Sequence, residues 1–143
     1  MLFGQIPEQI PIEEGRGIRG ELGAYEAHDD AMGLPLEEVV RRLAGYLGET
    51  VVAAIGGVNE TRAVKQWMEE GGRRPQRPDV LRFALQIASM IANTKDPNVA
   101  RAWFQGCNPH LNDQVPAILL RDGSLHEVQP AIISAARSFA KRD

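Results

Sequence analysis

The chain has 143 residues, enough for one ordinary domain or two very small ones, and a formal net charge of −3. Hydrophobic residues make up 43% and charged residues 24%, which supports a packed core and argues against disorder along the whole chain. There is no apolar run of the ~18 residues that a membrane span needs and no secretory signal, and the single cysteine excludes a disulfide framework. We therefore expect a soluble, cytoplasmic protein with no membrane partner.

The first predicted element is an acidic arm over residues 1–33. Prolines and glycines interrupt most of it, apart from a short helical stretch around Glu21–Met32. Residues 1–35 carry seven acids against two arginines, whereas residues 36–143 carry fourteen bases against twelve acids. This asymmetry predicts that the arm either meets a charged partner or covers a basic surface of the body or of a second subunit.

From Pro35 onward the apolar residues recur at intervals of three and four, with no convincing strand, which predicts an all-α fold. The expected helices are Leu36–Leu47, Glu49–Ile55, 60–70, Asp79–Asn93, 97–105, Gln114–Leu120 and 124–141. We interpret them as a helix-turn-helix bundle over residues 34–93, followed by a smaller helical domain over residues 94–143.

Capping residues set the expected ends of these helices. Asn59 is expected to cap the third helix and Asp96 the fifth. Ser124 and Glu127 have the spacing of a capping box at the start of the last helix. Pro130 is expected either to kink that helix or to begin it.

The second and third helices form a candidate helix-turn-helix motif, because a tight turn containing glycine separates them. The polar face of the third helix carries arginine, lysine and glutamine, which reach phosphates and purine edges in the major groove. Further arginines follow directly and suit backbone phosphates. The predicted contacts with double-stranded operator DNA are Asn59, Thr61, Arg62, Lys65, Gln66, Arg73, Arg74 and Arg77. The alternative is ordinary bundle packing with a solvated basic face.

A second candidate surface lies around residues 101–121. The loop over residues 105–113 is long and polar for a helix connection, which suits the polar rim of an interface. Trp103 and Phe104 are adjacent, so we expect one in the core and the other at a partner surface, unless both are core aromatics around a bend. The predicted partner-binding residues are Arg101, Trp103, Phe104, Asn108, His110, Leu111, Asn112, Pro116 and Arg121. The competing interpretation is a structural loop in which Leu111 and Pro116 pack the C-terminal helices.

Two segments of the chain carry a family pattern in the same order. Val52–Pro75 has Trp67 and the later glycine and proline in the places typical of an Xre-type helix-turn-helix. The second segment has a tryptophan, an Asn-x-x-Leu, a proline and then a glycine before the last helix, as Trp103, Asn108, Leu111, Pro116 and Gly123. Together they resemble the Xre/MbcA/ParS antitoxins, over roughly residues 36–141.

The resemblance implies a helical, usually dimeric antitoxin. It implies that the protein neutralises a RES-domain toxin, an enzyme that consumes NAD, and represses its own operon. We expect a homodimer that binds operator DNA and a cognate toxin. The alternative is a free-standing helix-turn-helix regulator, or a DNA-associated structural protein, without a toxin partner.

The remaining motifs lack the context that their chemistry needs. Residues 15–20 match the dinucleotide fingerprint, but prolines precede them and no strand is expected there. Cys107, His110 and His126 do not supply the four ligands of a structural zinc site, so we expect an ordinary buried thiol in a loop. The histidine and aspartates at 28–30 are expected to be a solvated acidic stretch. We therefore expect no catalytic residues, no metal and no cofactor, and a protein that is not an enzyme.

Overall fold

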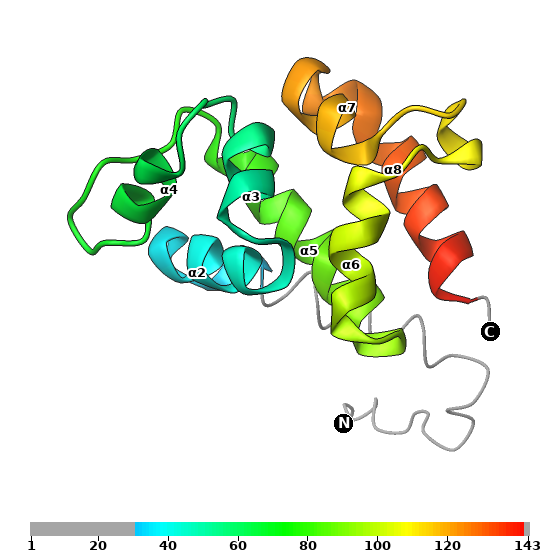
Figure 1. Cartoon of the computed structure of the whole chain (residues 1–143), viewed down its shortest axis with the longest axis horizontal. Helices are drawn as coiled ribbons and strands as arrows, with labels where there is room; N and C mark the ends of the chain where they lie inside the picture. Colours follow the sequence, from blue (N-terminus) through cyan, green and yellow to red (C-terminus); the bar gives the residue numbers. More distant parts are fainter. Residues whose placement is uncertain (1–30, 142–143) are drawn as a thin grey trace, which may run out of the picture.

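The computed structural model describes residues 31–141, and every regular element among them is a helix (Figure 1). The expected all-α fold is confirmed. In chain order the elements are α2 (Leu36–Leu47), α3 (Glu49–Ile55), α4 (Thr61–Trp67), α5 (Pro78–Thr94), α6 (Pro97–Gln105), the short 3-10 helix η2 (Pro109–Leu111), α7 (Pro116–Asp122) and α8 (Leu125–Ala140).

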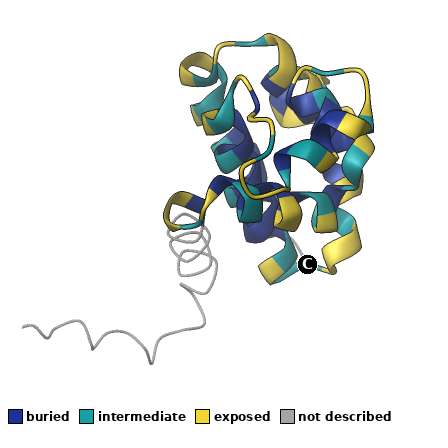
Figure 2. Cartoon of the chain, turned by 90° about the vertical axis from the view of Figure 1, so that its left-hand side faces the viewer, coloured by how far each residue is buried: buried dark blue, intermediate teal, exposed yellow. Residues whose placement is uncertain are grey.

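The helix α5 is the centre of the bundle. Figure 1 shows α2, α3 and α4 to one side of it and α6, α7 and α8 to the other. Ten of its seventeen residues are buried, and it packs against α2, α3, α6 and α8. Further contacts join α2 to α6 and α3 to α7. Described residues of both ranges, 34–93 and 94–143, therefore share one hydrophobic cluster, in which every described helix takes part. Figure 2 shows the buried residues on the inner sides of the helices.

The ends of several helices follow the sequence expectations. The bounds of α2 and α3 agree with the prediction, and α6 begins after Asp96, whose carboxylate accepts a hydrogen bond of 2.9 Å from the backbone N–H of Asn98. Pro97 is the first residue of α6, where a backbone N–H would have no partner within the helix, so the missing N–H of proline costs nothing. The cap and the proline together define this start.

Two expectations about helix ends are wrong. Glu60, not Asn59, is the N-cap of α4, and α4 ends at Trp67, so it is shorter than predicted. Ser124 is the N-cap of α8 but makes no capping bond through its side chain. Of the two alternatives expected for Pro130, the start of the helix is excluded, because α8 begins at Leu125 and Pro130 lies inside it. Pro130 and His126 are both exposed, so water can reach the carbonyl that the proline ring leaves without a donor.

The chain enters the described region at a fixed point on α5. Ala31 is buried, and the Nη1 of Arg82 donates hydrogen bonds of 2.8 and 2.7 Å to the carbonyl oxygens of Ala31 and Leu34. Most of the predicted arm, residues 1–30, lies outside the described residues. Within the described part, no helix is long and apolar enough to cross a membrane.

Candidate nucleic-acid interface

A Schellman turn joins α3 to α4. Gly57 has a left-handed backbone with φ of 82°, and its N–H donates to the carbonyl of Ala54 over 3.1 Å. The N–H of Val58 donates to the carbonyl of Ala53 over 2.9 Å. Glycine adopts this conformation without the steric cost of a Cβ, so the turn stops α3 and redirects the chain toward α4.

The inner face of α4 is fixed against α3. Ala63, Val64 and Trp67 are buried, and the indole of Trp67 lies against Gly56 at the end of α3. A Cβ at position 56 would lie 2.6 Å from Cη2 of Trp67, so only glycine permits this close approach. The carbonyl of Met68, the C-cap of α4, accepts a hydrogen bond of 2.7 Å from Nη2 of Arg41 on α2.

The outer face of α4 carries the predicted DNA-contacting residues. Arg62 and Lys65 are exposed, while Gln66 and Thr61 are half-buried. Nζ of Lys65 lies 2.7 Å from Oε1 of Glu49, so this lysine forms an ion pair on the protein surface. Arg62 has no hydrogen bond or ion pair with another described residue.

The arginines that follow α4 separate into two groups. Arg73 and Arg74 are exposed. The guanidinium of Arg77 instead donates to three carbonyls at the end of α7, those of Leu120 at 3.1 Å, Arg121 at 2.8 Å and Gly123 at 3.0 Å. Arg77 therefore joins the start of α5 to the end of α7 rather than extending into solvent.

Acidic groups accompany the basic ones around this surface. Glu60, Glu69 and Glu70 are exposed at the two ends of α4. On α2, hydrogen bonds from Arg42 and Arg41 hold the pKa of the Glu38 carboxyl below its usual value. The surface around α4 is therefore mixed in charge. Its exposed basic groups outside ion pairs between described residues are Arg62 on α4 and Arg73 and Arg74 after it.

A polar hollow lies beside the helix-turn-helix. It has a volume of about 420 Å³, and small apolar residues of α3 and the turn contribute to its lining. Its polar lining is Thr50, Asn59, Thr61 and Arg121. Arg121 comes from α7, and Nε of its side chain donates to Oδ1 of Asp122 over 2.8 Å, which lowers the pKa of that carboxyl. The sequence pattern assigned Arg121 to the partner surface and did not single out Thr50. The predicted DNA contacts lie on and beside α4, whereas Thr50 lies on α3 and Arg121 on α7.

The structure divides the predicted partner-binding residues. Trp103, Phe104, Asn108, Leu111 and Pro116 are buried. The two aromatic rings pack edge to face, with centroids 5.3 Å apart, and the ring of Phe139 lies 6.5 Å from that of Trp103. The expectation that one of the adjacent aromatics lies at a partner surface is wrong, and the alternative of two core aromatics is confirmed. Both are buried because α6 has packing neighbours on more than one side.

Asn108 organises the loop after α6. Its side-chain Oδ1 accepts a hydrogen bond of 2.9 Å from the N–H of His110, and its carbonyl accepts from the N–H groups of Leu111 and Asp113. Asn112 and Asp113 both have positive φ, so the loop reverses tightly. The exposed members of the predicted surface are Arg101, His110, Asn112 and Arg121.

The other sequence motifs yield no site in the described region. No group of three or more histidine, cysteine, aspartate or glutamate residues there could hold a metal ion. The thiol of Cys107 is exposed, not buried as expected, because it lies at the start of the surface loop. The glycine motif at 15–20 and the acidic stretch at 28–30 lie outside the described residues.

Comparison with known proteins adds no assignment. No family model matches the chain, and neither a curated protein nor a solved structure is significantly similar to it.

Proposed function

We propose that the protein is a DNA-binding antitoxin that binds operator DNA through α4 and represses its own operon. One observation carries the DNA-binding proposal. The buried inner face of α4 and the close contact of Trp67 with Gly56 hold this helix in place, while its outer face carries Arg62, Lys65 and Gln66. A rigid helix with donors on its free face can enter the major groove and contact base edges.

The surroundings of α4 suit the phosphate backbone. Arg73 and Arg74 are exposed beyond its C-terminal end, and phosphate contacts position a protein on the duplex without reading sequence. The polar hollow supplies Thr50, Thr61 and Arg121 as hydrogen-bond donors for a further phosphate. Arg77 is not assigned to DNA, because its guanidinium is engaged with α7.

The toxin-binding part of the proposal rests on the family resemblance and on the exposed loop after α6. His110 and Asn112 are exposed on a loop that Asn108 holds in shape. Polar side chains on a fixed loop suit the rim of a protein interface. We assign the cognate RES-domain toxin to this loop and to Arg101. The loop is supported on its buried side by Trp103, Phe104, Leu111 and Pro116.

Binding to a fragment of the protein's own promoter tests the first part. Arg62→Ala should weaken binding by on the order of 1–3 kcal/mol if Arg62 makes a bidentate base contact. Arg73→Ala or Arg74→Ala should weaken binding to all sequences alike and reduce the slope of log affinity against log salt by about one. Fluorescence anisotropy over a salt series measures both effects.

Two further variants serve as controls for this experiment. Arg42→Ala removes the same charge from α2, where Arg42 pairs with Glu38, and should change affinity little. Glu49→Gln removes the partner of Lys65 together with a negative charge, and should raise affinity. If the wild-type protein fails to shift the promoter fragment at low salt, the DNA-binding proposal is wrong.

A co-expression growth assay with the cognate toxin tests the second part. His110→Ala combined with Asn112→Gly changes two exposed side chains, and glycine keeps the left-handed backbone of residue 112, so the thermal midpoint should stay nearly constant. The double variant should lose neutralisation of the toxin. Full neutralisation by a stably folded double variant would remove the loop from the proposed interface. DNA binding without any toxin partner would favour a free-standing regulator.

A further inference from the structure

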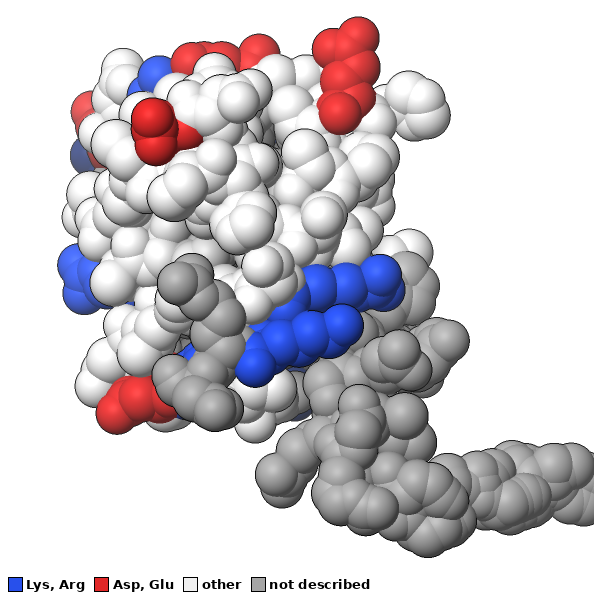
Figure 3. Space-filling view, turned by 90° about the vertical axis from the view of Figure 1, so that its right-hand side faces the viewer, with Lys and Arg blue, Asp and Glu red and all other residues white. Residues whose placement is uncertain are grey.

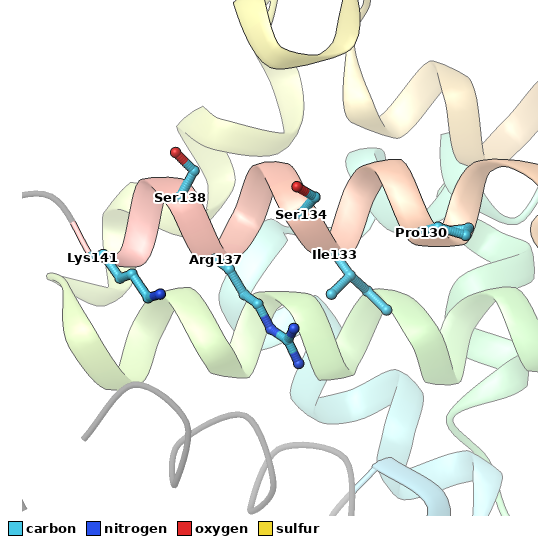
Figure 4. A pocket seen from close by; sticks show the side chains of 6 residues that line it. All are labelled: Pro130, Ile133, Ser134, Arg137, Ser138 and Lys141. Atoms are coloured by element: carbon cyan, nitrogen blue, oxygen red, sulfur yellow. The ribbon is translucent and has the colours of Figure 1, made fainter. Parts of the chain in front are cut away.

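The outer side of α8 carries a basic stripe beside a shallow hollow. The hollow has a volume of about 600 Å³, and its described lining comes from α8 and its C-cap: Pro130, Ile133, Ser134, Arg137, Ser138 and Lys141. Figure 4 shows the side chains of Ile133, Arg137 and Lys141 on the same side of the helix. Their spacing of four places one partly buried apolar side chain in line with two exposed cations.

A third cation lies near the C-terminal end of α8, on another side of the helix from Arg137 and Lys141. Nζ of Lys95 is 5.6 Å from the centre of the Phe139 ring, which belongs to α8. No salt bridge joins Lys95, Arg137 or Lys141 to a carboxylate of residues 31–141. Figure 3 shows neighbouring Lys and Arg side chains on the lower half of the face nearest the C-terminal end of α8, with most of the acidic groups along its upper margin.

The segment that matches this surface belongs to the same chain. Residues 1–30 contain seven acids and two arginines, a net charge of −5. They also contain apolar residues among the acids, such as Ile18, Leu22 and Tyr25. This segment therefore offers both components that the stripe lacks, carboxylates for the cations and apolar side chains for Ile133.

The point at which the chain enters the fold places this segment within reach. Arg82 holds Ala31 and Leu34 against α5, and α5 packs along α8. The helix α5 is about 25 Å long at 1.5 Å per residue, whereas thirty extended residues can span about 100 Å. Covalent attachment at Ala31 keeps the local concentration of the acids high near α8.

We propose that the acidic segment 1–30 docks in cis on the α8 stripe formed by Ile133, Arg137 and Lys141, with Lys95 as a further cation near the C-terminal end of α8. The surface of α4 is a poorer match, because Glu60, Glu69 and Glu70 are exposed beside its basic residues and Lys65 is paired with Glu49. Acidic side chains would be repelled there and attracted at α8.

Zero-length cross-linking of the full-length protein with a carbodiimide tests this proposal. The reagent joins a lysine amine to a carboxylate in contact with it, and the chain has three lysines, Lys65, Lys95 and Lys141. We expect cross-links from Lys141 and Lys95 to acids between residues 8 and 30. The 2.7 Å pair of Lys65 with Glu49 should cross-link in the same sample and serves as an internal control.

A mixture of unlabelled and nitrogen-15-labelled chains distinguishes docking within one chain from docking between two. Cross-links of residues 8–30 to Lys141 or Lys95 within single chains support the proposal. Cross-links that join labelled to unlabelled chains would overturn it in favour of a second copy as the occupant. Cross-links of the segment to Lys65 alone, or none beside a clear Lys65–Glu49 product, would also overturn it.

Charge reversal at Arg137 gives a second test without removing a reactive lysine. Arg137→Glu should lower the yield of arm cross-links at Lys141 at least fivefold, while Arg137→Lys should keep most of it. Arg42→Glu, the matched reversal on α2, should leave the yield unchanged. The Lys65–Glu49 product reports in every variant that the α3–α4 pair is folded. An equal loss in the Arg137 and Arg42 variants would contradict docking on α8.

Discussion

Gly56 and Trp67 show how one missing side chain positions a whole helix. The indole of Trp67 occupies the space where a Cβ of residue 56 would lie, and this contact sets the distance between α3 and α4. Trp67 is only 3% exposed, and the structure gives its indole N–H no hydrogen-bond partner among the described residues. The tryptophan therefore acts at this position through its packed surface.

Gly56→Ala should destabilise the protein because the ring of Trp67 must move. Overpacking a close contact of this kind costs typically 1–3 kcal/mol of unfolding free energy. Urea denaturation followed by tryptophan fluorescence measures the change.

Gly45→Ala is the matched control in α2. A Cβ at position 45 meets no atom within 4 Å, and alanine is favoured over glycine in a helix by about 1 kcal/mol. This variant should be slightly more stable than the wild type. Equal destabilisation by both substitutions would show that the contact with Trp67 is not the cause.

At the residue scale, the sequence predicted the inner face of α4 but not every side-chain role. The apolar spacing of Ala63, Val64 and Trp67 identified them as buried, because helical periodicity is a local signal. Arg77 looked like its neighbours Arg73 and Arg74. The carbonyls that Arg77 binds lie more than forty residues later in the chain. A pattern of neighbouring residues cannot predict a contact between segments so far apart in the sequence.

Among the elements, α7 and the start of α5 are joined by Arg77. The carbonyls at the end of a helix lack intrahelical donors, and the guanidinium of Arg77 supplies three hydrogen bonds to this region. A positive charge at the C-terminal end of α7 also matches its helix dipole. This arrangement positions α7, and therefore Arg121, beside α3.

Arg77→Ala should lower the free energy of unfolding by about 2 kcal/mol, since hydrogen bonds from charged groups contribute on that order. Arg74→Ala changes an exposed side chain and should stay within about 0.5 kcal/mol of the wild type. Thermal denaturation followed by circular dichroism compares the two variants. A stable Arg77→Ala protein with weakened DNA binding would instead return Arg77 to the proposed interface.

Helix ends show where local sequence signals succeed and where they stop. The Asp96-Pro97 pair set the start of α6 because both residues act on the first turn alone. Asn59 did not cap α4, because the chain is still extended at Glu60, which is the N-cap and makes no capping bond through its side chain. Adjacent Trp103 and Phe104 could not be assigned from spacing, since their burial depends on how many helices surround α6.

For the whole molecule, the sequence predicted the fold class but not how its halves meet. Hydrophobic periodicity indicates that a helix has a buried face, yet it does not say which helices share that face. The contacts of α2 with α6 and of α3 with α7 join residues from both sides of the expected boundary near residue 93.

The proposed operator binding predicts a homodimer in solution. One helix-turn-helix reads few base pairs, and two-fold dimers read paired half-sites about one helical turn apart. Sedimentation equilibrium at micromolar concentrations should give a mass about twice the 15.7 kDa of one chain. A mass near 15.7 kDa over that whole range would contradict the dimer.

The central position of α5 has a consequence for how the protein loses its structure. Because buried residues of α5 face helices from both ends of the chain, melting either half would expose the apolar surface that the other half needs. Neither half then has a separate unfolding equilibrium, and the described region should behave as one cooperative unit. The activities proposed for α4 and for the loop after α6 would then disappear together on heating, at a single temperature.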